Sequence, residues 1–239
     1  MGEGREDLRR EARPVKLRFV SAGAAYGLVT RIAAASGVEV EGHFGAVGAM
    51  LEKFSAGEAC DVVILTRPQI DALAAKGSVI ASSVVDLGSA PTSIAVRAGD
   101  PLPQVSDEAT LREALLAADA IYFPDPEKAT AGIHFAKVLG LLGIRDAVAT
   151  RIRTFPNGAT AMKAMGQSTG RPIGCTQATE ILAEPSVRLV APLPRGFDLS
   201  TTYTAAVGTK APDRHNAESF VRKLGSLESR KTRKAAGFE

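Results

Sequence analysis

The stretch VEVEGHFGAVGAMLEKFSAGEACDVVILT, residues 38–66, decides the fold class. Its apolar residues alternate with polar ones over 38–44, recur at helical spacing over 45–57 and form a β-branched run over 61–65. Alternation is typical of a strand, the 3.6-residue period is typical of a helix, and an unbroken β-branched run is typical of a strand in a buried parallel sheet. The stretch therefore predicts a unit of strand, helix and strand.

Both flanks of this unit repeat the pattern. Residues 17–20 (LRFV) predict a strand, residues 24–35 predict an Ala-rich helix that ends at Gly37, and residues 67–76 predict a helix that ends at Gly77. Glycine just beyond the last periodic residue is a common end of a helix. Three successive strand-helix units predict a parallel sheet with right-handed crossovers.

A second series of elements follows a strand predicted over 92–99 and the Pro-rich segment 100–103. We expect helices over 107–118, 130–142 and 157–165, with a short helix after Gln177. We expect strands over 120–123, 152–155, 172–175 and 187–190. The chain then ends with a predicted strand over 201–208 and helices over 212–224 and 226–236.

Two Pro-rich segments, 100–103 and 192–196, bracket the middle of the chain and suggest its domain organisation. We predict one discontinuous lobe and one inserted lobe, formed by residues 1–92 with 205–239 and by residues 93–204. The expected fold class is α/β, with mostly parallel sheets and two strands that cross between the lobes. Two such lobes leave a cleft between them, where a ligand would bind.

Composition and charge exclude several classes of partner. The 239 residues carry a net charge of +3, and residues 222–239 alone hold six basic and two acidic side chains without interleaved aromatic residues. We expect this segment to be a solvated helix face, so we predict no nucleic-acid partner. No segment approaches the roughly 18 consecutive apolar residues of a membrane span, so we predict no membrane insertion.

The cysteines and the first fifteen residues lead to further expectations. Cys60 and Cys175 fit no metal-ligand spacing, so we expect two buried thiols, no metal and no cofactor.

Residues 1–15, MGEGREDLRREARPV, have no apolar run of the kind a signal peptide needs, and we expect a flexible extension. The location would be periplasmic if a leader has been removed and cytoplasmic if the chain is native as written. We expect a monomer.

The candidate site follows from where the predicted strands end. Ligands of parallel α/β sheets bind beyond the carboxyl ends of the strands, where helix N-termini expose backbone N–H groups and partial positive charge. The residues at these places are mostly small or carry a hydroxyl or amide: Ser21, Gly23, Ala24, Ala46, Val47, Thr66, Ala131, Gly132, Asn157, Gly158 and Gln177. Together they predict an anion site built from amides and hydroxyls, although each one alone is also ordinary turn chemistry.

Other side chains near these strand ends suit a carboxylate ligand. Arginine offers a bidentate fork and histidine a switchable donor, which makes His43, Arg67, His134 and Arg153 candidates. Tyr26 and Tyr203 complete the candidate set. For each of these, packing or exposure to solvent is the alternative. No Gly-x-Ser-x-Gly elbow is present, so we predict no serine-hydrolase chemistry.

The order of the loops resembles that of a known family. The segments FVSAGAAYGLVTRIA, SAGEACDVVILT, DPEKATAGIHFAK, IGCTQATEI, TTYTAAVGTKAP and the final GF resemble the periplasmic molybdate-binding proteins of ABC transporters. The resemblance implies the type II periplasmic binding-protein fold, with two lobes that close on a small oxyanion held by hydroxyls and amides. It places ligand contacts at Ser21, Ala46, Val47, Ala131, Asn157, Gly158 and Gln177.

This chain departs from the family pattern in three loops. It has Gly45, Ala46, Val47 and Gly48 where the molybdate binders carry a serine-rich loop, Gly23 or Ala24 where a serine is usual, and Gln177 where they carry tyrosine. Each lost hydroxyl removes a charge-assisted hydrogen bond worth about 1.5 to 3 kcal/mol. The ligand loops are therefore altered relative to those of the family.

Three functions are compatible with this pattern. The first is a solute-binding protein that closes on a small anionic ligand, an oxyanion or a carboxylate, for uptake through an ABC permease. The second is an enzyme on the same scaffold that resembles aconitate isomerase, with His43 or His134 as the base that moves a proton. The third is a cytoplasmic ligand sensor.

Overall fold

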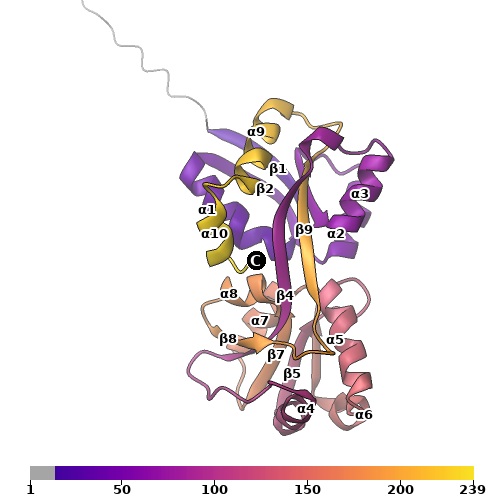
Figure 1. The fold of residues 1–239 in the computed structure, drawn as a ribbon, viewed down its shortest axis with the longest axis vertical. Coiled ribbons are helices and arrows are strands. Elements are labelled where there is room, and N and C mark those ends of the chain that lie inside the picture. Colours follow the sequence, from indigo (N-terminus) through magenta and orange to yellow (C-terminus); the bar gives the residue numbers. More distant parts are fainter. Residues whose placement is uncertain (1–13) are drawn as a thin grey trace, which may run out of the picture.

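The computed structural model describes residues 14–239, so most of the predicted extension over 1–15 lies outside the described residues. The chain forms two lobes stacked along the long axis of the molecule (Figure 1). The first lobe is the part whose hydrophobic core comes from residues 17–90 and 203–238. The inserted lobe is the part whose hydrophobic cores come from residues 94–197. The predicted α/β class is confirmed.

The first lobe has a sheet with the strand order β2-β1-β3-β9-β4. β1 runs parallel to β2 and β3, while β9 is antiparallel to β3 and β4. The strands are β1 (Val15–Ala22), β2 (Val38–Gly45), β3 (Val62–Thr66), β4 (Val85–Arg97) and β9 (Ser200–Val207). The helices are α1 (Tyr26–Ser36), α2 (Val47–Ser55), α3 (Arg67–Ala75), α9 (Arg214–Gly225) and α10 (Arg230–Ala235), with 3-10 turns η1 (Gly23–Ala25) and η2 (Ala81–Ser83).

The inserted lobe continues the sheet in the order β4-β7-β5-β6, with β8 paired to β4. β5 runs parallel to β6 and β7, and both β7 and β8 are antiparallel to β4. The strands are β5 (Ala120–Pro124), β6 (Ile152–Phe155), β7 (Pro172–Gln177) and β8 (Val187–Pro192). The helices are α4 (Glu108–Ala117), α5 (Thr130–Leu141), α6 (Arg145–Val148), α7 (Gly158–Gly166) and α8 (Ala178–Leu182), with the 3-10 turn η3 (Ala149–Arg151).

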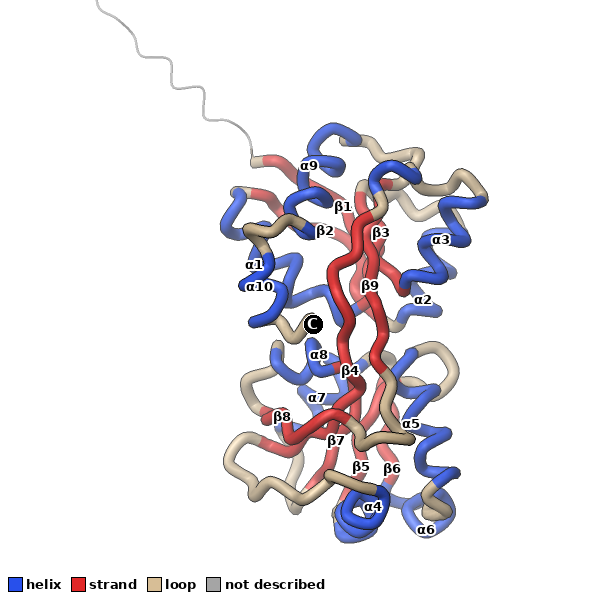
Figure 2. The backbone as a smooth tube through the Cα atoms, viewed as in Figure 1, coloured by secondary structure: helices blue, strands red, loops and turns tan. Residues whose placement is uncertain are grey.

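Two strands connect the lobes. β4 pairs with β9 over residues 85–91 and with β7 and β8 over residues 92–97, so a single strand belongs to both lobes. Figure 2 shows β4 and β9 side by side along the molecule. The lobe boundaries at 92/93 and 204/205 remain predictions, because no break in either strand marks them.

The predicted elements are all present, and the main differences from the prediction concern β4 and α6. The predicted strand over 92–99 is the second half of the longer β4, whose first half contains Gly88 and Pro91 and shifts register between Asp86 and Gly88. Residues of this kind are depleted in strands, and a β-bulge hides the alternation on which the prediction depends. The single-turn α6 is too short to show a helical period.

The described residues also show how the cysteines, the metal-ligating side chains and the helices are arranged. Cys60 and Cys175 are both buried and free, as predicted, and burial raises the pKa of the Cys60 thiol to about 12. Over residues 14–239, no cluster of three or more His, Cys, Asp or Glu side chains is arranged to hold a metal ion. Within that same range, no helix is both long enough and apolar enough to cross a bilayer.

Candidate functional site

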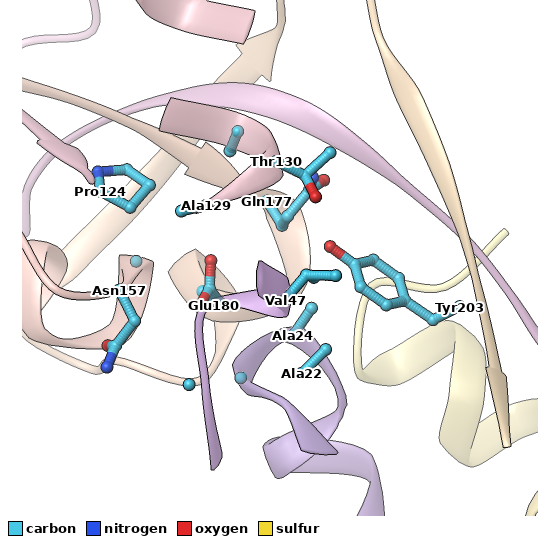
Figure 3. Close-up of a pocket in the computed structure, with 14 residues that line it drawn as sticks. Ala22, Ala24, Val47, Pro124, Ala129, Thr130, Asn157, Gln177, Glu180 and Tyr203 are labelled. Carbon is cyan, nitrogen blue, oxygen red and sulfur yellow. The ribbon is translucent and has the colours of Figure 1, made fainter. Parts of the chain in front are cut away.

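A small cavity lies where the two lobes meet, beyond the carboxyl ends of the parallel strands (Figure 3). The first lobe lines it with Ala22, Gly23, Ala24, Gly45, Val47 and Tyr203. The inserted lobe lines it with Pro124, Ala129, Thr130, Ala131, Asn157, Gly158, Gln177 and Glu180. Its volume of about 20 Å³ is close to the room that one water molecule needs. Any larger solute therefore requires the lobes to part.

The N-termini of α2 and α5 face this cavity from opposite lobes, at Val47 and Thr130. Their N-cap residues are Ala46 and Ala129, and neither provides a side-chain hydrogen bond. Serine, threonine, aspartate or asparagine usually accepts a first-turn N–H at this position. With alanine there, no N-cap side chain occupies the first-turn N–H groups. Apart from the Gly48 N–H, which donates to the Lys128 carbonyl oxygen, these donors and the partial positive charge of both helix ends are left for a ligand.

Glu180 lies in the same cavity and is 7 % exposed (Figure 3). Thr176 Oγ1 donates to Glu180 Oε2 at 2.5 Å, and this hydrogen bond together with the nearby backbone N–H groups of Ala159, Gln177 and Gly158 lowers the pKa of the carboxyl. Burial raises the pKa of Glu180, and these hydrogen bonds offset only part of the rise. Since no Lys, Arg or His among residues 14–239 lines the cavity, this carboxyl has no cationic partner in the described part of the chain.

Two glycines make room for the Glu180 carboxyl. A Cβ atom at Gly158 would overlap Glu180 Oε2 and Thr176 Oγ1, both of which are buried. A Cβ atom at Gly23 would lie 3.0 Å from Glu180 Oε1. Both glycines were predicted as ligand contacts, and the structure gives them a steric role toward Glu180.

Gln177 and Tyr203 add polar side chains to the lining of the cavity. The Gln177 Nε2 atom donates to Thr201 Oγ1 at 3.4 Å, a long hydrogen bond, and Gln177 Oε1 is buried without a partner. Burial, and after it the nearby Glu180 charge, raises the pKa of the Tyr203 hydroxyl well above the usual range, and the neighbouring Gln177 side chain offsets only part of the rise. Tyr203 therefore stays a neutral phenol. Gln177 has one amide atom left for a ligand.

The structure brings about half of the predicted site residues together. Those that line the cavity are Gly23, Ala24, Val47, Ala131, Asn157, Gly158, Gln177 and Tyr203. Asn157 lies at the edge, because its Oδ1 accepts the Thr160 N–H at 2.9 Å and caps α7. Three further predicted residues adjoin the lining without being part of it, namely Ser21, Ala46 and Gly132. The Ser21 hydroxyl is turned to the Ala22 carbonyl oxygen at 3.0 Å.

Four predicted residues at strand ends of the first lobe lie outside the cavity. His43 is on the edge strand β2 and faces Glu58 at 3.5 Å. Thr66 caps α3 with Gln69, and Arg67 turns away to Asp71 and Asp86. Tyr26 is 50 % exposed and packs edge-on against Phe44. In each case a local partner on the same or a neighbouring element directs the side chain away from the lobe junction.

Neither candidate base from the sequence reaches the site. His43 is directed to Glu58, and His134 Nε2 lies 2.6 Å from the carbonyl oxygen of Phe197. Arg153, the remaining carboxylate candidate, donates to the carbonyl oxygens of Thr150 and Ile152 on its own strand end. The ionisable group of the cavity is Glu180, which the sequence analysis missed. An acidic residue in the first turn of a helix usually complements the helix dipole in solvent, so the sequence held no signal of its burial.

Contacts beside the cavity hold the two lobes together. The Gly48 N–H, in the first turn of α2, donates to the Lys128 carbonyl oxygen at 3.0 Å. Lys128 Nζ in turn pairs with Glu52 Oε2 at 3.0 Å. Asp125 Oδ1 accepts the N–H groups of Glu127 and Lys128, which fixes the turn that presents Lys128. The structure is therefore a closed arrangement of the lobes.

The raised pKa of Glu180 predicts a pH dependence of stability. The pKa of Glu180 in the folded state lies above its ordinary value of 4.5. At pH values between the ordinary pKa and the folded-state pKa, the folded state therefore binds more protons than the unfolded state. The free energy of unfolding consequently falls as the pH rises through this range. Glu180→Gln removes this term. We expect the unfolding free energy of the wild type, relative to that of the variant, to decrease from pH 4.5 upward, which urea titrations at several pH values would measure. Parallel pH profiles of the two proteins would contradict the assignment.

Comparisons with known proteins place this geometry in context. The family model for bacterial extracellular solute-binding proteins matches residues 17–239. A relative from Pseudomonas sp, named aconitate isomerase, is 26% identical over 195 residues, which are 80% of this chain and 71% of that protein.

Solved structures share the fold at low identity. The periplasmic molybdate-binding protein of Azotobacter vinelandii superposes with a TM-score of 0.73 and 18% identity, over 93% of this chain and 98% of that one. The sulfate-binding protein of Mycobacterium tuberculosis superposes with a TM-score of 0.68 and 19% identity, over 94% and 86% of the two chains. These likenesses confirm the two-lobed periplasmic binding-protein fold. Because the family model spans nearly every described residue, the chain belongs to the bacterial extracellular solute-binding protein family.

Proposed function

We propose that the lobes close on a small carboxylic acid, and that the protein presents this acid to the permease of an ABC transporter. The observation that carries the proposal is the pairing, in one cavity, of two uncapped helix N-termini with the buried carboxyl of Glu180. The helix ends suit a carboxylate, which accepts N–H hydrogen bonds without a positively charged side chain.

Glu180 favours a carboxylic acid over a tetrahedral oxyanion. A sulfate or molybdate ion carries charge on all sides, so in so small a cavity part of it would face the Glu180 carboxyl, and the lining formed by residues 14–239 has no cation to compensate. Two unit charges 5 Å apart repel by about 3 kcal/mol at an effective dielectric constant of 20. A carboxylic acid can direct its carboxylate groups to the helix ends and its C–H groups toward Glu180.

A panel of anions tests the proposal. At a concentration of 100 Kd a ligand adds about 2.7 kcal/mol of stability, which for a chain of this length raises the Tm by roughly 5 to 10 °C. We expect this shift with members of a set that contains cis-aconitate, trans-aconitate, citrate, succinate and malonate, confirmed by calorimetry. A shift with molybdate or sulfate but with none of the acids would overturn the proposal, and so would the absence of any shift.

A second candidate function is isomerisation of an unsaturated tricarboxylic acid. It is favoured by the similarity to the Pseudomonas protein named aconitate isomerase and by an ionisable carboxyl inside the cavity. Moving a double bond between carbons requires a group that takes and returns a proton. Conversion of trans-aconitate to cis-aconitate, followed by chromatography, tests this function; acids that bind without any conversion would leave the solute-binding proposal alone.

A further inference from the structure

We propose that Glu180 is the proton-transferring residue of this site, acting on a polycarboxylic acid that has a C–H group next to a carbon-carbon double bond. This inference rests on the second candidate function and names the residue that would perform it. It replaces His43 and His134, neither of which lines the cavity.

Elimination among the lining residues points to Glu180. Of the described side chains around the cavity, all from residues 14–239, only those of Glu180 and Tyr203 can titrate. Tyr203 is 1% exposed and its pKa is raised, so it remains a phenol across the physiological range. Thr130 and Asn157 carry polar groups that do not exchange protons as bases at neutral pH. Within the described part of the chain, Glu180 is therefore the one lining group that can accept a proton from carbon.

The two carboxyl oxygens of Glu180 have different neighbours. Oε2 accepts the Thr176 hydroxyl and lies against Gly158 of the inserted lobe. Oε1 faces Gly23 of the first lobe, at 3.0 Å from the place where a Cβ atom would be, and no side chain in residues 14–239 donates to it. Thr176 and Gly158 thus orient the carboxyl, while Oε1 remains on the side where the lobes meet and a ligand enters.

The N-termini of α2 and α5, which also line the cavity, would hold the charge that the reaction creates. When a proton leaves the allylic carbon, its electron pair spreads over the carbon chain and onto a carboxylate of the substrate. The uncapped N-termini of α2 and α5 offer N–H donors for that carboxylate. Preorganised donors at the place where negative charge develops are a major source of rate acceleration.

The step balances without any cofactor. The Glu180 carboxylate takes H⁺ from the allylic C–H, the C–H electron pair becomes part of a delocalised anion, and Glu180 becomes a carboxylic acid. The same carboxylic acid then returns H⁺ to the other end of the three-carbon unit, so the double bond moves by one carbon and Glu180 is a carboxylate again. No group is oxidised or reduced. The substrate class is an unsaturated acid with two or more carboxylates.

The experiment measures binding and proton transfer separately. Wild-type protein, Glu180→Gln and the exposed control Glu113→Gln on α4 are each incubated with trans-aconitate in D₂O. Calorimetry gives Kd, NMR gives deuterium at the allylic carbon, and chromatography gives the isomer. We expect Glu180→Gln to retain binding within a few-fold and to lose about 10²- to 10⁴-fold of the isomerisation rate, with Glu113→Gln unchanged.

A second variant covers the case in which Glu180→Gln fails to fold. Thr176→Val removes the hydroxyl that stabilises the Glu180 carboxylate, which raises the pKa of that carboxyl further. Because the carboxylate is the active form, we expect the rising limb of the pH-rate profile to move to higher pH. A role of Thr176 in packing alone would lower the rate at every pH without moving this limb.

The outcomes separate this inference from the proposed function. Isomerisation by the wild type that Glu180→Gln abolishes supports the inference. Binding of trans-aconitate without deuterium incorporation or isomerisation, or an equal rate in Glu180→Gln, overturns the inference and leaves the solute-binding proposal standing. If no acid of the panel binds, both are overturned.

Discussion

Replacing Gly132 by alanine is expected to lower the free energy of unfolding by about 2 to 3 kcal/mol, the range of an overpacked core site, and to abolish ligand binding. A Cβ atom at Gly132 would overlap the carbonyl oxygens of Pro124 and Asp125. These are backbone atoms in a turn held by hydrogen bonds from Asp125 N to Phe155 O and from Ala129 N to Asp125 O. The first turn of α5 would therefore have to move away from the cavity.

Gly140→Ala is the matched control for this prediction. Gly140 lies in the same helix, its φ angle is not positive, and nothing lies within 4 Å of its missing Cβ atom. Alanine there should stabilise the protein by about 0.5 to 1 kcal/mol through its helix propensity. For a chain of this length, thermal unfolding should show a Tm roughly 5 to 10 °C below the wild type for Gly132→Ala, and no loss for Gly140→Ala. Equal Tm values for the two variants would refute the steric argument.

Glu180→Gln is expected to admit tetrahedral oxyanions, with a gain of at least about tenfold in affinity for molybdate or sulfate, which corresponds to about 1.4 kcal/mol. The substitution removes the negative charge from the lining and supplies an amide N–H donor at nearly the same volume. No lining cation has to be rearranged, because the described residues place none on the lining. Calorimetry with molybdate, sulfate and citrate on both proteins would measure the change.

A pH series and a control variant test this prediction further. Lowering the pH should have the same direction of effect on the wild type, because protonation of Glu180 also removes its charge, while the variant should show little pH dependence of molybdate binding. The control Glu113→Gln, which is far from the cavity in α4, should bind as the wild type does. Unchanged molybdate affinity in Glu180→Gln would mean that the carboxyl does not set the specificity of this site.

Much of the fold could be predicted because its signals are local. The strand-helix units of the first 77 residues follow from periodicity and from glycines such as Gly37 and Gly77, which end α1 and follow the end of α3 in the structure. β4 was predicted only in part, because it is stabilised by partners from both lobes rather than by its own pattern. A strand shared between two sheets is a tertiary feature.

The candidate site also has a part that could be predicted from the sequence and a part that could not. Positions whose backbone serves the cavity, such as Val47, Ala131 and Gly158, could be inferred because the ends of parallel strands share one edge of a sheet. Side-chain directions could not be inferred: His43 turns to Glu58, and Arg67 turns to two aspartates. Glu58 and Asp86 lie outside the element that carries their partner, whereas Asp71 lies one turn further along the same helix as Arg67.

The sequence by itself therefore determined the α/β class, the order of the elements and the helix N-termini that surround the cavity, because these depend on periodicity and on residues close together along the chain. Only the tertiary structure decided that Glu180 is the ionisable group of the site. Its burial results from the packing of α7 and η1 over α8, where Gly23 and Gly158 leave space for one carboxyl and Thr176 holds it. A pattern of neighbouring residues cannot predict such a space, because the atoms that surround it come from both lobes.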